Sequence, residues 1–159
     1  KLSDMSENTA FRRVIRDPNT NLKDNDIKKV VICSGKVFYN LLEERENRKL
    51  DSVKILRLEQ IYPFPYSTLK EILSDTPNAE FVWCQEEPKN MGAWFFVDRK
   101  IEDVLRSFKA KFSRPSYAGR AEAASPATGS LSRHNKEQAD LVNEALETTT
   151  KKTTKHAAE

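Results

Sequence analysis

Short apolar runs alternate along the chain with segments whose apolar residues recur every three or four positions. Three runs are continuous enough for strands that are buried on both faces: Lys29–Cys33, Val53–Leu58 and Phe81–Cys84. Two weaker candidates, Phe11–Ile15 and Ser116–Ala118, predict a short edge strand near the start and a last strand near the end. The pattern therefore predicts about five strands.

Helical spacing fills the intervals between these strands. The clearest helix follows Gly92, where five apolar residues share one face: Ala93, Val97, Ile101, Val104 and Phe108. A second helix is predicted to begin near Val37, and a third to begin at a cap formed by Ser67 or Thr68. A final helix is predicted over Arg133–Leu146. Strands that alternate with helices pair in parallel through right-handed crossovers. The order therefore predicts a three-layer α/β sandwich around a mostly parallel sheet.

Composition sets the limits of the folded part. The chain has 159 residues and 38% hydrophobic content, which is enough for one domain with a core. We expect this domain to span residues 11–146, after a flexible lead-in at 1–10 and before a disordered tail at 147–159 that is rich in threonine and lysine. The first residue is not methionine, which is consistent with a fragment of a longer protein.

Charge and apolar content argue against two classes of partner. The net charge is +3, and both signs are mixed along the chain, which is unlike a nucleic-acid-binding domain. No apolar run approaches the ~20 residues of a membrane span. Cys33 and Cys84 lie within predicted strands, which predicts two buried thiols, and their spacing from the two histidines does not fit a zinc site.

Ser34, Gly35 and Lys36 form the sharpest local candidate for chemistry. They stand between a predicted strand and a predicted helix, where free backbone N–H groups and the positive end of the helix dipole favour an anion. Lys36 adds a positive charge. The motif lacks the first glycine and the length of a nucleotide-binding P-loop. The alternative is structural: Gly35 only makes a tight turn, and Ser34 only caps the helix.

Further polar candidates lie near a predicted turn at residues 85–90 and at the last helix. Glu86 and Glu87 are adjacent, so on an extended chain they point to opposite sides and do not act easily as an acid–base pair. We expect one to pair with a basic residue and the other to face solvent. His134 has no serine or cysteine nucleophile motif nearby, which argues against catalysis.

Four aromatic residues flank the same turn. Trp83 belongs to a continuous apolar run and is expected in the core. Trp94, Phe95 and Phe96 follow one another in a predicted helix, so they point about 100° apart and do not all pack on one sheet. We therefore expect part of this group to lie at an interface with another domain or subunit.

Long stretches of the chain resemble a known family. They are RVIRD, VVICSGKVFYNLLEERE, ILRLEQIYPFP, FVWCQEEPKNMGAWFFV, RPSYAGRAEAASPATGS and RHNKEQADLVNEAL. Together they cover about residues 11–146 and resemble the carboxy-terminal domain of 2-oxoglutarate dehydrogenase. The runs EEPKNMGAWFFV and RPSYAGRAEAASPATGS are the most specific, whereas SGK alone is not specific.

The resemblance implies a transketolase-like C-terminal domain within a large oxidoreductase. The parent enzyme of that family uses thiamine diphosphate and magnesium to decarboxylate 2-oxoglutarate oxidatively. It passes the succinyl group to a lipoyl domain of dihydrolipoyl succinyltransferase in the tricarboxylic acid cycle. The C-terminal domain supports a homodimer, and some relatives bind AMP or acetyl-CoA as a regulatory nucleotide in contact with it. The implied location is the bacterial cytoplasm or the mitochondrial matrix.

The resemblance also implies roles within this chain. The thiamine motif of the family, GDG followed by a distant asparagine, is absent, as are the magnesium ligands. We therefore expect no catalytic residue, cofactor or metal in this chain, and no decarboxylation by it alone. Arg13 and Arg120 resemble basic positions near the regulatory site of the family, so they join Ser34, Gly35 and Lys36 in the predicted anion site. The alternative function is a stand-alone anion- or nucleotide-binding α/β module.

Overall fold

The computed structural model describes residues 2–147, so residues 148–159 of the predicted tail lie outside the described residues. The strands are β1 (Val14–Ile15), β2 (Lys29–Cys33), β3 (Val53–Leu58), β4 (Glu80–Pro88) and β5 (Ser116–Arg120). The α-helices are α1 (Val37–Asn47), α2 (Tyr66–Leu73), α3 (Trp94–Ser107) and α4 (Leu131–Leu146). Two short 3-10 helices, η1 (Leu2–Met5) and η2 (Asp24–Asp26), complete the described elements.

The strands form one five-stranded sheet in the order β1-β3-β2-β4-β5. Strands β2 to β5 run parallel to one another, and β1 pairs antiparallel with β3 at the outer side of the sheet. This arrangement confirms the predicted mostly parallel sheet and its short edge strand. Because β3 and β4 flank β2 on opposite sides, the chain reverses its direction across the sheet between β2 and β4.

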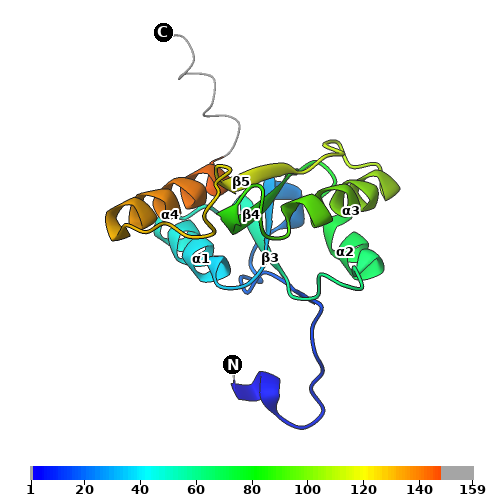
Figure 1. Ribbon diagram of the computed structural model, residues 1–159. Coiled ribbons are helices and arrows are strands. Elements are labelled where there is room, and N and C mark those ends of the chain that lie inside the picture. The colour runs from blue at the N-terminus through cyan, green and yellow to red at the C-terminus, as the bar shows by residue number, and fades with distance from the viewer. Residues whose placement is uncertain (1, 148–159) are drawn as a thin grey trace.

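Helices cover both faces of the sheet, which confirms the three layers (Figure 1). Alternating strand residues divide the core in two, because successive side chains of a strand point to opposite faces. One half, with residues such as Val30 and Trp83, packs against α2 and α3. The other half, with residues such as Val31 and Cys84, packs against α1 and α4. Most strand positions are therefore apolar on both faces, as the continuous runs predict.

The two rims of the sheet differ in which segments they carry. We call the rim at which the parallel strands end the carboxyl edge, and the opposite rim the amino edge. Each α-helix begins near the carboxyl edge, because each follows the end of a parallel strand. The lead-in also reaches the carboxyl edge, since β1 is antiparallel and pairs Val14 with Leu58 at the end of β3.

The turn predicted at residues 85–90 is corrected by the structure. β4 continues to Pro88 because its end still pairs with β5, after a register shift between Cys84 and Pro88. The Lys89 N–H then donates to the Arg120 carbonyl at 3.0 Å, which keeps the two strand ends together. The change of direction occurs only at residues 89–93, where Gly92 has a φ of +68°.

The predicted helix caps are also wrong. α2 begins at Tyr66, directly after Pro65, and makes no side-chain cap hydrogen bond with Ser67 or Thr68. α1 begins after Lys36 and takes no cap from Ser34. A proline with fixed φ and a glycine turn shape these helix starts instead. The lead-in, predicted to be flexible, contains the short 3-10 helix η1.

Candidate functional site

A cavity of about 480 Å³ opens at the carboxyl edge where the chain reverses between β2 and β4. In open α/β sheets such a crevice is the usual place for a ligand. One group of lining residues follows β2: Ser34, Gly35 and Lys36. The other group comes from the end of β4 and the start of α3, together with Ile61: Trp83, Gln85, Glu86, Glu87, Gly92, Ala93 and Phe96. The structure thus places the predicted SGK motif in a cavity.

Gly35 gives the β2–α1 turn its shape. Its φ of +70° lies in the left-handed region that favours glycine. A Cβ at this position would meet no atom within 4 Å, so the backbone is open to approach from the cavity. The first turn of α1 follows at Val37, where the Tyr39 N–H already donates to the Lys36 carbonyl at 3.0 Å, which leaves the N–H groups of Val37 and Phe38 without a partner in the helix. Lys36 is exposed beside them.

Gln85 organises the opposite side of the cavity. Its side chain is buried, and its Oε1 accepts hydrogen bonds from Trp83 Nε1 at 2.9 Å and from the Trp94 N–H at 3.0 Å. Its Nε2 lies within hydrogen-bond distance of three backbone carbonyls, of which the closest is that of Met91 at 2.7 Å. One amide therefore ties the end of β4 to the start of α3. No local pattern in the sequence indicated this role, and Gln85 fell within the turn predicted at residues 85–90.

Glu86 and Glu87 have separate environments, as their opposite directions predict. Glu87 is exposed, whereas Glu86 is partly buried and accepts a hydrogen bond from Gln138 Nε2 at 2.9 Å. The expected basic partner of Glu86 is therefore replaced by an amide. The Gln138 Oε1 accepts in turn from Arg120 at 3.2 Å, so Gln138 connects the cavity to Arg120.

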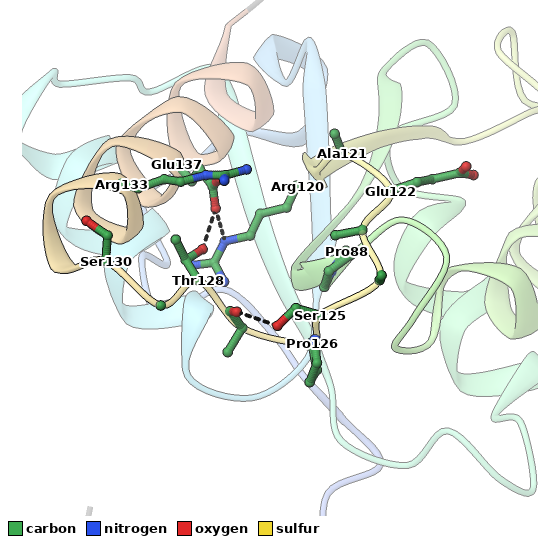
Figure 2. A pocket seen from close by; sticks show the side chains of 14 residues that line it. Pro88, Arg120, Ala121, Glu122, Ser125, Pro126, Thr128, Ser130, Arg133 and Glu137 are labelled. Atoms are coloured by element: carbon green, nitrogen blue, oxygen red, sulfur yellow. Dashed lines mark hydrogen bonds and ion pairs between the residues drawn. The ribbon is translucent and has the colours of Figure 1, made fainter.

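Arg120 lies beside a second cavity of about 460 Å³, bordered by the small-residue segment at 121–130 (Figure 2). Its Nε is 3.4 Å from Glu137 Oε2, and its guanidinium also contacts His134 Nδ1 at 3.1 Å. Glu137 accepts further hydrogen bonds from Thr128 and Arg133, both at 2.7 Å. These hydrogen bonds, with the two arginine charges, hold the pKa of Glu137 below its usual value. Arg120 is thus already engaged with a carboxylate.

Arg13 is far from Arg120. Its carbonyl accepts hydrogen bonds from the N–H groups of Glu59 and Gln60, which places it at the end of β3. β1 and β5 are the two outer strands, so about 19 Å separates them at the usual spacing of strands. The five residues of the predicted anion site therefore do not share one cavity. Ser34, Gly35 and Lys36 share one, Arg120 is connected to Glu86 of that cavity through Gln138, and Arg13 stands apart.

The aromatic group divides sharply. Trp83 is 1% exposed and belongs to the core, as predicted. Trp94 is 7% exposed and packs against Tyr117, with ring centroids 5.3 Å apart. Trp94 is therefore the member of the group that packs inward, because it starts α3 on its inner side. Phe95 and Phe96 are 62% and 41% exposed, so the interface prediction now rests on these two residues.

Both cysteines are buried free thiols, as predicted. Burial raises the pKa of Cys84 to about 12, and it also raises that of Cys33. Such thiols are poor nucleophiles. Within residues 2–147, no group of three or more His, Cys, Asp or Glu side chains is placed to hold a metal ion. No helix in this part of the chain is long and apolar enough to cross a membrane.

The comparison with protein families identifies this fold and its motifs. The family model described as "2-oxoglutarate dehydrogenase C-terminal" matches residues 1–146. The chain belongs to this family. The match includes the lead-in as well as the sandwich, so residues 1–10 are part of what the family has in common.

Curated relatives agree with the family match. The 2-oxoglutarate dehydrogenase E1 components of Brucella anthropi and Brucella ovis are each 49% identical to this chain over 153 residues. The alignment covers 91% of this chain and 15% of each relative. This member of the 2-oxoglutarate dehydrogenase C-terminal family thus spans less than a fifth of the length of the relatives it matches.

A solved structure supports the fold alone. A split-gene transketolase, described as an inactive β4 tetramer, matches with a TM-score of 0.52 at 14% identity. The match covers 89% of this chain and 44% of the transketolase chain. The predicted transketolase-like α/β architecture is therefore confirmed.

Proposed function

We propose that this chain acts as the C-terminal domain of a 2-oxoglutarate dehydrogenase E1 component, where it supports dimer assembly and binds a regulatory nucleotide. The whole enzyme would decarboxylate 2-oxoglutarate oxidatively and pass the succinyl group to dihydrolipoyl succinyltransferase, in a bacterial cytoplasm or a mitochondrial matrix. The family match over residues 1–146 and the 49% identity to E1 components support this placement.

Thiamine diphosphate and magnesium would be held by other parts of that enzyme. The residues of this chain do not fit the cofactor, because within residues 2–147 no group of three or more His, Cys, Asp or Glu side chains is placed to hold its magnesium ion. The domain would therefore contribute to assembly and regulation. The exposed Phe95 and Phe96 support a contact of this domain with another part of the enzyme.

The observation that carries the regulatory role is the position of SGK in the crevice between β2 and β4. A phosphate at the start of α1 gains about 0.3–1 kcal/mol from the helix dipole, and up to ~2 kcal/mol if partly buried. Lys36 adds a cation, and the open backbone at Gly35 permits close approach. These terms favour a phosphate near Gly35.

The two carboxylates across the cavity give a reason to favour a nucleotide over a simple phosphate. Carboxylates in α/β nucleotide sites accept hydrogen bonds from ribose hydroxyls. Glu87 is exposed at the cavity and is positioned to accept such a bond, while Phe96 and Ile61 offer apolar surface for a base. AMP and the adenosine part of acetyl-CoA have both features.

Calorimetric titration of the full-length enzyme with AMP and with acetyl-CoA tests this proposal. Lys36→Glu should weaken binding about tenfold, equal to about 1.4 kcal/mol, and more strongly at low salt. The matched control is Lys28→Glu, because Lys28 is an exposed lysine at the other end of β2. Unchanged affinity for both ligands in Lys36→Glu would leave SGK as a turn between a strand and a helix.

A further inference from the structure

Lys100, near the middle of α3, is surrounded by aromatic rings. Lys100 Nζ lies 4.8 Å from the ring centroid of Phe96, 5.8 Å from that of Tyr66 and 6.0 Å from that of Phe64. The Tyr66 hydroxyl is 3.5 Å from the same ammonium group. We call these four residues, with Tyr62 and Phe95 next to them in the chain, the Lys100 surface.

Much of the Lys100 surface is open to solvent. Tyr62 is 81% exposed, Phe95 62%, Tyr66 42% and Phe96 41%. These side chains come from the β3–α2 loop and from the first turns of α2 and α3, and α2 and α3 pack against each other. Exposed aromatic side chains at the starts of two helices that pack together mark a place where a protein partner binds.

The charge at its centre is unmatched inside the domain. Arg99 and Arg106, which lie on the same helix, both pair with Glu102. Lys100 makes no ion pair within residues 2–147, and its polar contact there is the long one to Tyr66. An ammonium group that loses water when a partner covers it is costly unless it gains an anion. The partner should therefore present a carboxylate together with apolar side chains.

The path of the lead-in indicates which partner this is. The Arg13 carbonyl accepts hydrogen bonds from Glu59 and Gln60, immediately before the loop that carries Tyr62 and Phe64. Figure 1 shows the lead-in leaving the domain on this side. In a dehydrogenase of which this family forms the C-terminal part, the preceding polypeptide enters through the lead-in, beside the Lys100 surface.

A second copy of the domain fits this surface less well. A twofold contact would bring the same patch of both copies together. The Lys100 surface has one cation and no carboxylate among its residues, so a contact between two copies of it would offer neither Lys100 an anion.

We infer that the Lys100 surface binds the part of the dehydrogenase that precedes this domain in the same polypeptide, through apolar contacts and a carboxylate that pairs with Lys100. This inference rests on the proposed function, because it requires a full-length E1 component. Beyond the proposed function, the inference specifies the surface, the chemistry of the contact and the identity of the partner.

Hydroxyl-radical footprinting of the full-length enzyme tests whether the surface is covered. Phe112 is the matched control, because it is an aromatic residue with 39% exposure at the amino edge, close to the 41% of Phe96. We expect Phe95 and Phe96 to be oxidised at least fivefold more slowly than Phe112. Equal oxidation rates at the three residues would overturn the inference.

Carbodiimide coupling, which joins an amine directly to a carboxylate in contact with it, tests the partner. We expect a link between Lys100 and an Asp or Glu that precedes the domain. Lys111 is the control, because its Nζ lies 5.4 Å from the Phe112 ring in a similar cation–aromatic pair at the amino edge. It should give no link to the preceding part. The absence of a Lys100 link would contradict the inference.

Cross-linking of enzyme assembled from equal amounts of unlabelled and ¹⁵N-labelled chains distinguishes links within one polypeptide from links between two subunits. Links within one polypeptide join peptides of the same isotopic form, whereas links between subunits also give mixed pairs. Mixed pairs at Lys100 would assign the surface to the partner subunit and overturn the inference. Failure of the proposed function would be seen separately, as an enzyme that neither turns over 2-oxoglutarate nor binds nucleotide while its Lys100 links persist.

Discussion

The two edges of the sheet differ in which side chains they bury and which they expose. At the amino edge, charged residues at the starts of strands are buried and matched within the domain. Lys29 lies 3.9 Å from Glu80 and donates a hydrogen bond to the Glu147 carbonyl, and Lys54 pairs with Asp24 at 2.7 Å. The amino edge thus satisfies its own charges.

The carboxyl edge differs in the apolar side chains that it exposes to solvent. Six exposed large apolar side chains lie in its loops and in the first turns of the helices that begin there: Tyr39, Tyr62, Tyr66, Phe95, Phe96 and Leu131. Phe112 is the counterpart at the amino edge among the described residues. A buried charge that is paired within the domain needs no partner molecule. Exposed aromatic rings around a cation without an ion pair favour the binding of a partner molecule. The carboxyl edge is therefore the edge from which binding is expected.

The largest effect that we predict separates a carboxyl-edge core residue from an amino-edge surface residue. Trp83→Ala should lower the free energy of unfolding by about 3–5 kcal/mol, because it leaves a cavity beneath the crevice and removes the hydrogen bond to Gln85. Phe112→Ala should cost about 1 kcal/mol or less. Urea unfolding of the 159-residue chain measures both. Similar losses for the two variants would mean that Phe112 is as much a core residue as Trp83.

A smaller effect distinguishes two glycines of the carboxyl edge. Both have positive φ, +70° at Gly35 and +68° at Gly92, so alanine strains the backbone at either position by about 1–2 kcal/mol. At Gly92 the added Cβ would also lie 2.9 Å from Gln85 Nε2 and 3.0 Å from Glu87 Cβ. Gln85 is held by its hydrogen bonds and does not move aside without losing them. We expect Gly92→Ala to cost about 2–4 kcal/mol.

The difference between these two variants measures the role of Gln85. Thermal unfolding compares Gly35→Ala and Gly92→Ala in the wild-type chain, and Gly92→Ala again in a chain that already carries Gln85→Ala. We expect Gly92→Ala to cost less stability in the Gln85→Ala background. An equal cost for Gly35→Ala and Gly92→Ala would show that backbone conformation alone determines both.

The sequence predicted the layers of this fold because local patterns determine them. The apolar runs of β2 and β3 and the helical spacing of α3 depend on neighbouring residues, and they gave the elements and the parallel pairing. SGK was found as a unit because its residues are contiguous and follow a strand. The limits of β4 were missed because the pairing of Pro88 with Arg120 depends on a strand distant in the sequence.

Relations across the sheet were harder to predict. Nothing local indicates that β1 is antiparallel on the far side of β3, which places Arg13 about 19 Å from the strand of Arg120. Gln85 was predicted to lie in a turn. Its hydrogen-bond partners, among residues 83–94, come within reach of its amide only in the folded chain. The spacing of three successive aromatics did not show which of them is buried, so the sequence did not separate Trp94 from Phe95 and Phe96.

The smallest effect that we predict concerns pH and the amino-edge side of α3. Glu102 has a side chain that is 7% exposed and lies 2.9 Å from Arg99 and 2.7 Å from Arg114. Burial acts to raise the pKa of Glu102, but the hydrogen bond from Arg99 and the charges of Arg106, Arg114 and Arg99 outweigh it and lower the pKa from its ordinary 4.5. The carboxylate form is therefore favoured in the folded state.

A lowered pKa in the folded state contributes stability that is fully present above the unfolded pKa near 4.5 and is lost as the pH falls through the folded pKa. Glu102→Gln should therefore melt below the wild-type chain at pH 7, and the two melting curves should converge as the pH is lowered towards 3. Arg114→Gln should also reduce the pH dependence, since it removes a partner of the carboxylate. The arginines are largely exposed, so added salt should narrow the difference at pH 7. A gap between wild type and Glu102→Gln that stayed constant from pH 7 to pH 3 would mean that the shape of Glu102, and not its charge, holds the end of α3.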